Sequence, residues 1–485
     1  MSALDQPWNI GAALARGAAL HPDRDAIVAA DVRLSYAKLW QIAQAFALNM
    51  QKIGIGHGMT VALESRDIIA SVSVMAATAL VGARFVLHNP QTGAEPGPLI
   101  VLYSPDRPTP HAEGATVVQM TADWSPRHTP VSPETAARFA GAESAEAPWW
   151  TIHTSGTTGK PKALVLSQRI AFDRSVAAAG DFRGGETRFC SIFPCYTRPF
   201  FVRAMAALVN GATLLDFVDP DILSREGANL FSGSPKLVQD WLTRWQPRPR
   251  FARLQVSGAP FSDAAASRML AVFDQVEDVY GAGETNKSFV NLRVLQDGQV
   301  SRIGRPQDST VQVLLADGQP CDVGEVGEVR VHNDYLAPGY RDAPEATARA
   351  FRDGWFHPGD LARWEPGGAL TIVGRVDQII NLSGTKIDPA EVEEVLHEVT
   401  GVRQAAVFLD PLEQIPLRTM AFLMLEPGTD MVSTVDRAIA HCAQRLAGLK
   451  APGYFFVVPE IPMTHDGVPR RSECARIAKD LPRGG

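Results

Sequence analysis

Hydroxyl, glycine and lysine side chains are concentrated in residues 154–162, which read Thr-Ser-Gly-Thr-Thr-Gly-Lys-Pro-Lys. Glycines allow a backbone to turn tightly and to bring its N–H groups against a ligand, and Ser and Thr hydroxyls add further donors. Lysine adds a positive charge that suits phosphate. This segment therefore predicts a loop that binds a polyphosphate, and a flexible surface loop of small residues is the alternative.

Apolar segments flank the loop, with residues 149–152 before it and residues 163–166 after it. Both are suited to buried strands, so we expect the loop to join two strands. A Walker loop is excluded, because Thr154 stands where that motif requires Gly and Pro161 where it requires Ser or Thr. A dinucleotide fingerprint is excluded as well, since Asn286 replaces the third glycine in the nearest match.

The loop resembles the signature segment of the adenylate-forming superfamily, which includes acyl-CoA synthetases, luciferases and peptide-synthetase adenylation domains. The resemblance implies that Lys160 is a catalytic residue, because it neutralises the pyrophosphate that leaves ATP. It also implies that Thr157 contributes to a Mg²⁺ site. The phosphate-binding residues that it implies are Thr154, Ser155, Gly156, Thr157, Thr158 and Gly159.

Residues 280–285 read Tyr-Gly-Ala-Gly-Glu-Thr and resemble the superfamily's Tyr-Gly-x-Thr-Glu segment. The resemblance implies that Tyr280 stacks on adenine and that Glu284 is a catalytic residue that holds Mg²⁺. Gly283 replaces the threonine that donates to the α-phosphate in the superfamily, and the sequence leaves open whether Thr285 substitutes for it.

Residues 257–260 read Ser-Gly-Ala-Pro and resemble the loop on the adenine side of the superfamily's nucleotide site. A turn of small residues lets a flat base lie against the backbone. Gly258, Ala259 and Pro260 are therefore implied to bind the nucleotide.

The ribose and the thiol have implied residues near the predicted domain boundary. Asp360 matches the carboxylate that accepts both ribose hydroxyls, and a turn-capping aspartate is the alternative. Arg375 is implied to contact the ribose, and Asp377 to be the hinge about which a small domain turns. Residues 381–393 match the loop that enters the site for thioester formation, in which Gly384 lines the thiol channel.

One catalytic lysine of the superfamily is missing. Residues 462–471 keep the pattern of its last motif, but Val468 occupies the lysine position. Losing one preorganised donor costs about 10²–10³ in rate, and valine cannot supply the charge. Arg470 is the nearest cation in sequence and is our candidate for a catalytic replacement, with a solvated surface side chain as the alternative of equal weight.

Residues 193–201 stand where the superfamily has its acyl-pocket segment. The segment is aromatic, and Arg198 is its only charged residue. It lacks the aspartate with which amino-acid-activating relatives hold an ammonium group, so we expect an apolar acyl or aryl acid. Phe200 and Phe201 are equally well explained as core residues.

Helix-period and strand-like runs alternate through most of the chain, which predicts an α/β protein with parallel strand pairing. Shorter alternating strands after residue 300 suit an antiparallel, barrel-like subdomain. We expect a large N-terminal AMP-binding domain of layered sheets (residues 1–374), a hinge (residues 375–377) and a small mobile α+β domain (residues 378–485). A chain of 485 residues is too long for one core, which agrees with more than one domain.

Composition limits the cell compartment and the partners. The net charge of −7 gives no reason to expect nucleic acid, and the five cysteines have no C-x-x-C spacing. The most apolar helical stretch, residues 68–81, is shorter than the ~20 residues of a membrane span. No export signal is visible. We expect a cytoplasmic protein without a membrane span.

The favoured hypothesis is an ATP-dependent, AMP-forming acid–thiol ligase that uses Mg²⁺ and transfers an acyl group to CoA. A free carrier protein is the alternative acceptor. A nucleotide- or acyl-adenylate-binding relative with impaired adenylation is the second hypothesis, because of Val468 and Gly283.

Overall fold

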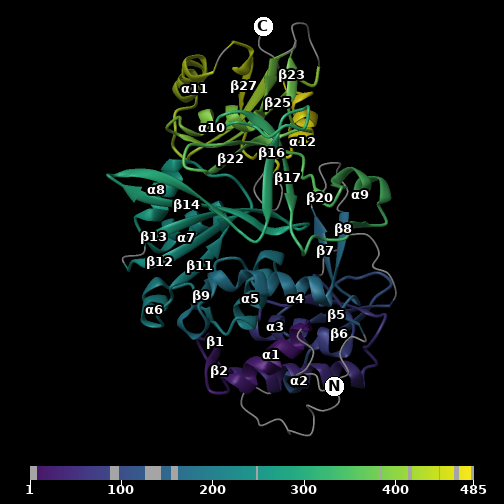
Figure 1. Cartoon of the computed structure of the whole chain (residues 1–485). Helices are drawn as coiled ribbons and strands as arrows, with labels where there is room; N and C mark the ends of the chain where they lie inside the picture. The colour runs from purple at the N-terminus through teal and green to yellow at the C-terminus, as the bar shows by residue number, and fades with distance from the viewer. Residues whose placement is uncertain are drawn as a thin grey trace.

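The computed structural model describes residues 8–87, 98–125, 144–154, 162–246, 249–382, 385–412, 418–446, 448–463 and 469–481. Within these residues the fold is mixed α/β, as the sequence predicts. Figure 1 shows the helices α1–α3 at one end of the molecule and the elements that follow residue 377 at the other.

Two large sheets build most of the chain before residue 342. The first is nine-stranded and mostly parallel in its described part, because β1 and β9–β13 run in one direction. Its order is β15 (Gln299–Pro306), β14 (Asn286–Gln296), β13 (Phe273–Ala282), β12 (Phe251–Ser257), β11 (Leu230–Gly233), β9 (Arg188–Ser191), β10 (Thr213–Asp216), β1 (Asp25–Ala29) and β2 (Arg33–Ser35).

The second large sheet carries the flanks of the predicted phosphate loop. Its strands β3–β7 pair in parallel, whereas β7 and β8 are antiparallel neighbours. The described order is β18 (Tyr340–Arg341), β8 (Lys162–Ser167), β7 (Pro148–Thr154), β4 (Arg84–Leu87), β3 (Thr60–Glu64), β5 (Leu99–Tyr103) and β6 (Thr116–Gln119).

Helices join these two sheets through one core. The largest core cluster combines side chains of both sheets with helices α1–α5. These helices are α1 (Ile10–Leu20), α2 (Tyr36–Lys52), α3 (Ile68–Val81), α4 (Gln168–Ala177) and α5 (Arg198–Val209). Ser35 caps α2, since its hydroxyl accepts from the Lys38 N–H at 3.3 Å. None of the helices in the described residues combines the length and apolarity that a membrane crossing requires.

A second core lies on the nine-stranded sheet. Phe231, Phe251 and Phe273 pack against one another and against Trp241 there. Helices alternate with the strands β10–β13 here: α6 (Pro220–Arg225), α7 (Pro235–Trp245) and α8 (Asp263–Leu270).

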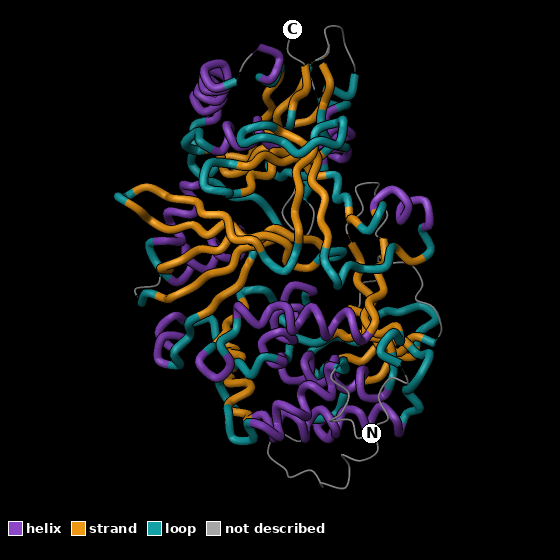
Figure 2. The backbone as a smooth tube through the Cα atoms, viewed as in Figure 1, coloured by secondary structure: helices purple, strands orange, loops and turns teal. Residues whose placement is uncertain are grey.

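The strands after residue 306 form the expected antiparallel subdomain, which Figure 2 shows between the large sheets and the C-terminal elements. Its backbone pairs β16 (Thr310–Leu314) with β17 (Val326–His332), and β17 with β20 (Trp355–Phe356) and β21 (Asp360–Trp364). The strands β19 (Phe351–Arg352) and β22 (Leu370–Arg375) complete it, and α9 (Pro344–Ala350) lies beside it.

The chain after residue 377 contains its own α+β elements and two core clusters made only of its own residues. Asp388 caps the first helix of this part of the chain, because its side chain accepts from the Ala390 N–H at 2.9 Å. The domain boundary at residues 375–377 stays a proposal. The elements are β23 (Ile380–Leu382), β24 (Thr385–Ile387), α10 (Pro389–His397), β25 (Val402–Leu409), β26 (Thr419–Leu425), α11 (Met431–Arg445), β27 (Tyr454–Val457) and α12 (Arg471–Ala478).

Candidate active site

The predicted adenine-side residues meet at the carboxyl edge of the nine-stranded sheet. Strands β12 and β13 are parallel, with Ser257 opposite Val279, so Gly258 follows the end of β12 beside Tyr280, which is still within β13. Gly258 has φ +100°, a conformation that favours glycine, and a Cβ there meets open space. The segment Gly258–Ala259–Pro260 and Tyr280 are therefore placed together at the edge where α/β proteins bind ligands.

A hydrogen-bonded chain ties this edge to the antiparallel subdomain. The Tyr280 hydroxyl donates to one oxygen of Asp360 at 2.7 Å, and Arg375 donates to the other at 2.9 Å. Asp360 and Arg375 are cross-strand partners on β21 and β22. Arg375 also donates to Asp377 at 3.0 Å. Asp360 is thus held by two side chains and still has a free lone pair on each oxygen for a ribose hydroxyl.

Burial controls the protonation of this pair. It raises the pKa of Asp360, and the Tyr280 and Arg375 contacts oppose that rise. Burial also raises the pKa of Tyr280 well above its ordinary value, and the Asp360 carboxylate adds to the effect. Tyr280 therefore remains a hydrogen-bond donor at neutral pH.

Glu284 lies buried a few residues beyond Tyr280, and one of its oxygens accepts from the Tyr340 hydroxyl at 2.7 Å. Tyr340 belongs to β18, which pairs with β8 at the C-terminal flank of the predicted loop. The Lys162 ammonium lies 4.9 Å from the centre of the Tyr340 ring. The fold thus brings the end of the loop to Glu284. The sequence assigned no role to Tyr340, and no local pattern marks it.

A buried arginine on α4 fixes the backbone on which Glu284 sits. Arg174 donates to the carbonyl oxygens of Gly283 at 2.9 Å and Glu284 at 2.7 Å. Its Nε donates to the carbonyl of Tyr335 at 3.0 Å. Burial, reinforced by the nearby Arg198 cation, lowers the pKa of Arg174 to about 9. Sequence reasoning missed this residue, because it lies about a hundred positions away from the segment that it holds.

The structure answers the question about Thr285. Its hydroxyl accepts from the Ala282 N–H at 3.2 Å and donates to the Asn286 carbonyl at 3.1 Å. The Ser288 hydroxyl contacts it as well, at 2.8 Å, and the residue is buried. Thr285 is therefore used inside its own turn and does not replace the donor missing at Gly283.

The predicted phosphate loop is bounded by described residues. Thr154 ends β7 and Lys162 begins β8, directly opposite each other in the ladder. A Cβ built on Gly283 lies 3.2 Å from the Thr154 methyl group, so the start of the loop borders the Tyr280–Glu284 segment. The remaining predicted residues lie outside the described residues; they are Ser155, Gly156, Thr157, Thr158, Gly159, Lys160, Gly384 and Val468.

Comparison with known proteins agrees with this geometry. The AMP-binding enzyme family matches residues 14–96 and 99–341, and the AMP-binding enzyme C-terminal domain matches residues 391–467. The chain belongs to the adenylate-forming superfamily. It is an AMP-forming ligase of the acyl-CoA synthetase kind, as the sequence predicts.

Among the relatives of this ligase is a salicylyl-CoA synthase / salicylate adenylyltransferase from a Streptomyces species. It is 28% identical over 333 residues, which cover 65% of this chain and 60% of that protein. A 2-hydroxy-7-methoxy-5-methyl-1-naphthoate–CoA ligase from Streptomyces carzinostaticus is 26% identical over 95% of this chain and 91% of its own.

The fold of the ligase matches that of O-succinylbenzoate coenzyme A synthetase from Bacillus subtilis, solved in complex with AMP. The TM-score is 0.82, at 21% identity, over 98% of this chain and 99% of that one. At this identity the match supports the fold alone, which confirms the predicted α/β architecture.

Arg470, our candidate cation of the ligase, is exposed at the start of α12. Its backbone N–H donates to the Pro462 carbonyl at 2.8 Å. The neighbouring Arg471 is the half-buried residue of the pair and contacts Glu393 at 2.7 Å and Gln378 at 2.8 Å. A catalytic role for Arg470 stays a prediction.

The aromatic segment, residues 193–201, contains core residues as well as the partly exposed Arg198. Phe200 and Phe201 lie in the main core, where Phe201 contacts Phe85 with ring centres 5.2 Å apart. The core interpretation therefore holds for both rings. Arg198 begins α5 and is partly exposed, so the segment turns from the site into the core within one helical turn.

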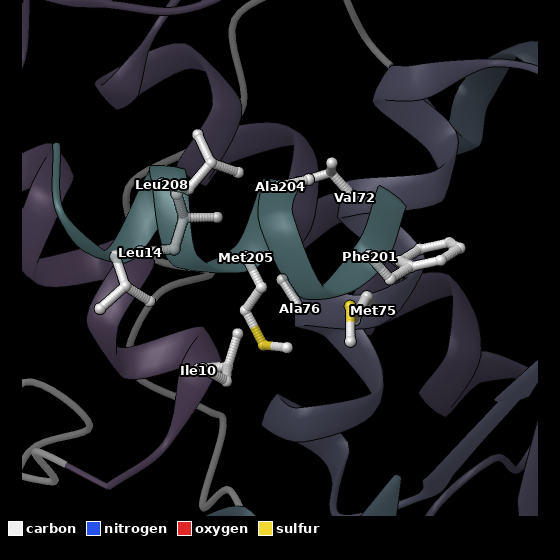
Figure 3. Close-up of a pocket in the computed structure, with 10 residues that line it drawn as sticks. Ile10, Leu14, Val72, Met75, Ala76, Phe201, Ala204, Met205 and Leu208 are labelled. Atoms are coloured by element: carbon white, nitrogen blue, oxygen red, sulfur yellow. The ribbon is translucent and has the colours of Figure 1, made fainter. Parts of the chain in front are cut away.

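An apolar cavity lies beside this segment and is separate from the predicted nucleotide residues. Figure 3 shows side chains of α1, α3 and α5 around it, among them Leu14, Met75 and Met205. Its cavity volume is about 20 Å³, which is room for about one water molecule. None of the residues implied to bind nucleotide lines it.

The carboxylate of Glu284 fits a magnesium ion that is bound together with a nucleotide. Mg²⁺ in such sites takes one or two protein carboxylates and completes its shell with phosphate oxygens and water. One Glu284 oxygen accepts from Tyr340, which leaves the other oxygen for a cation. No cluster of three or more His, Cys, Asp or Glu side chains suited to a metal occurs in the parts of the chain that the structure describes.

Proposed function

We propose that the chain activates an apolar or aryl carboxylic acid with ATP and transfers the acyl group from acyl-AMP to CoA. The observation that carries this proposal is the presence of two held carboxylates at one segment, residues 280–284, where Asp360 contacts Tyr280 and Glu284 is part of the segment. Asp360 is held by Tyr280 and Arg375. Glu284 lies four residues after Tyr280 and is held by Tyr340. The first is suited to a ribose and the second to a metal-bound polyphosphate.

In the first half-reaction, an oxygen of the acid's carboxylate attacks the α-phosphorus of ATP, and the bond to pyrophosphate breaks. Asp360 and Arg375 position the ribose, and Gly258–Pro260 with Tyr280 position the base. Lys160 neutralises the pyrophosphate that leaves. When bound, Mg²⁺ supplies charge neutralisation for the phosphate oxygens, and Glu284 is the residue that holds it.

In the second half-reaction, a thiolate attacks the acyl carbonyl and AMP leaves with the electron pair of the broken bond. The hinge at Asp377 and the thiol channel at Gly384 serve this step. Their assignment rests on the superfamily resemblance.

The choice of an aryl acid is supported by the relatives that act on ring acids, salicylate and a substituted naphthoate. It is also supported by the substrate segment, which offers Arg198 as its only charge. CoA is the proposed acceptor because both of those relatives carry CoA in their names.

A second function has one specific observation in its favour. Gly283 provides no side-chain donor, and Thr285 is engaged within its own turn. A chain that binds nucleotide or acyl-adenylate but adenylates poorly fits that observation. A stand-alone enzyme that loads a carrier protein is the remaining alternative for the acceptor.

The deciding experiment measures pyrophosphate release from ATP and Mg²⁺ with benzoate, salicylate, 1-naphthoate, hexanoate and octanoate, and with L-phenylalanine as the amino-acid control. We expect release with an aryl or apolar acid, and its loss in the Lys160→Ala variant. Adding CoA should then yield a thioester and AMP. Nucleotide binding without pyrophosphate release from any acid would support the impaired relative.

A further inference from the structure

The guanidinium of Arg198 occupies the space that a side chain at position 283 would fill. A Cβ built on Gly283 lies 2.8 Å from Nη1 of Arg198. The other atoms around that point belong to Thr154, at 3.2 Å, and Leu164, at 3.3 Å. Gly283 is absent from the residues with positive φ, so the backbone does not require glycine there. Glycine at 283 instead makes room for the arginine.

The neighbours of this guanidinium place it at the centre of the site. Gly283 directly precedes the buried Glu284, and Thr154 is the first residue of the predicted phosphate loop. Arg198 itself starts α5 in the substrate segment and remains partly exposed. The cation therefore lies where the substrate segment, the phosphate loop and the metal-binding segment meet.

A second arginine, Arg174, fixes the backbone of Gly283. Arg174 donates to the Gly283 carbonyl at 2.9 Å, and the Arg198 charge contributes to the lowered pKa of Arg174. Two guanidinium groups thus stand near one glycine. One is buried and donates to carbonyl oxygens, and the other is partly exposed.

We infer that Arg198 is a catalytic residue of the adenylation step, in which its guanidinium holds the acid's carboxylate beside the α-phosphate. The inference rests on the proposed function. In that step the carboxylate oxygen forms a bond to phosphorus while the bond from phosphorus to pyrophosphate breaks, with no change in oxidation state. A fork of N–H donors suits two anionic oxygens. Arg198 then supplies the charge that Val468 cannot, and Arg470 is not required.

The test compares Arg198→Ala, Arg198→Lys, Gly283→Thr and the double variant R198A/G283T. Arg198→Ala should lower acid-dependent pyrophosphate release by roughly 10²–10³, and raise the KM for the acid more than the KM for ATP. Arg198→Lys should retain part of the rate. Thioester formation from preformed acyl-AMP should change far less, because the carboxylate charge is gone from that intermediate.

The double variant separates catalysis from packing. Gly283→Thr alone should lower the rate, because its Cβ displaces the guanidinium. In R198A/G283T the threonine has room, and its hydroxyl restores a donor, so this variant should be faster than Arg198→Ala. A purely structural role of Arg198 also relieves the clash in the double variant, but the added hydroxyl then has no effect on the chemistry, so it predicts a rate no higher than that of Arg198→Ala. Arg268→Met, an exposed arginine on α8, is the matched control and should keep the wild-type rate.

A binding arm distinguishes this inference from the proposed function. The AMP-loaded protein is titrated with benzoate and with salicylate by calorimetry. Wild type that binds either acid in this titration but releases no pyrophosphate from ATP and Mg²⁺ in the kinetic assay would sink the proposed function, while weaker acid binding in Arg198→Ala would still support the inference. Equal acid binding and equal pyrophosphate release in wild type and Arg198→Ala overturn the inference alone. The inference is also overturned if Arg470→Ala lowers pyrophosphate release and Arg198→Ala does not.

Discussion

The phenolic hydroxyl of Tyr340 donates a hydrogen bond of 2.7 Å to a carboxylate oxygen of Glu284. This contact fixes the carboxylate that we assign to magnesium, and the Tyr340→Phe variant removes it while keeping the ring beneath Lys162. We expect the KM for the Mg²⁺ complex of ATP to rise about tenfold or more, since a hydrogen bond to a charged group contributes roughly 1.5–3 kcal/mol. Steady-state kinetics over a range of Mg²⁺ concentrations measure this.

The matched control is Tyr335→Phe, whose lost hydroxyl donates to the Asp308 carbonyl at 3.0 Å rather than to Glu284. An unchanged Mg²⁺ dependence in Tyr340→Phe would argue against Glu284 as the magnesium residue.

Arg174 should be essential for both stability and activity. Its three donors contact the carbonyls of Tyr335, Gly283 and Glu284. Arg174→Met removes these bonds from the buried Tyr335 and Gly283 carbonyls, whereas the Glu284 carbonyl keeps the Ala337 N–H at 2.8 Å. We expect a loss of about 3 kcal/mol in the free energy of unfolding, measured by denaturant melts. Arg174→Lys should recover part of the stability and little of the pyrophosphate release, because one ammonium cannot reproduce the fork. A lysine variant with full activity would refute the positioning role.

Asp360 should determine how strongly the enzyme recognises the ribose. Asp360→Asn removes the charge that Tyr280 and Arg375 hold, and we expect the KM for ATP to rise by about tenfold or more. Wild type should use 3′-deoxy-ATP less well than ATP, and the variant should discriminate between them much less. If replacing ATP by 3′-deoxy-ATP lowers kcat/KM by the same factor in Asp360→Asn and in wild type, the ribose assignment fails.

The Asp388 cap should make the stability of the C-terminal domain depend on pH. Burial raises the pKa of Asp388 from 3.8 to about 6, because its Oδ2 is buried without a partner in the described residues. The folded state therefore binds the proton more tightly than the unfolded chain. The resulting stabilisation is complete below pH 3.8 and is lost as the pH rises through about 6.

The Asp388→Asn variant retains an oxygen for the Ala390 N–H and cannot ionise. We expect its Tm to exceed that of wild type increasingly between pH 4 and 7. Thermal melts of both proteins over this range measure the difference. A constant difference would show that Asp388 does not titrate in this window.

The hinge prediction separates the two half-reactions. Asp377→Pro fixes φ at one value, so it should favour one domain arrangement and affect adenylation and thioester formation unequally. Asp377→Ala also loses the contact with Arg375 but leaves φ free, which makes it the control. Equal effects on both half-reactions in a folded Asp377→Pro protein would count against domain rotation.

The sequence by itself determined the parts of this protein that depend on neighbouring residues. The apolar runs around residues 154–162 are strands β7 and β8, and Asp388 followed by Pro389 starts α10. The order of the segments also sufficed to indicate the family and the α/β fold. These features depend on periodicity, capping and short motifs, which act over a few residues and can be read in one dimension.

Tertiary structure alone decided which side chains complete the site. Arg174 reaches carbonyls about a hundred residues further along the chain, Tyr340 reaches Glu284 through the pairing of β18 with β8, and Arg198 fills the space of Gly283. No local pattern encodes these contacts, because each depends on how two sheets and the helices between them pack. The burial that shifts the pKa of Asp388 and Tyr280 is equally a product of that packing, since desolvation depends on atoms brought in from distant elements.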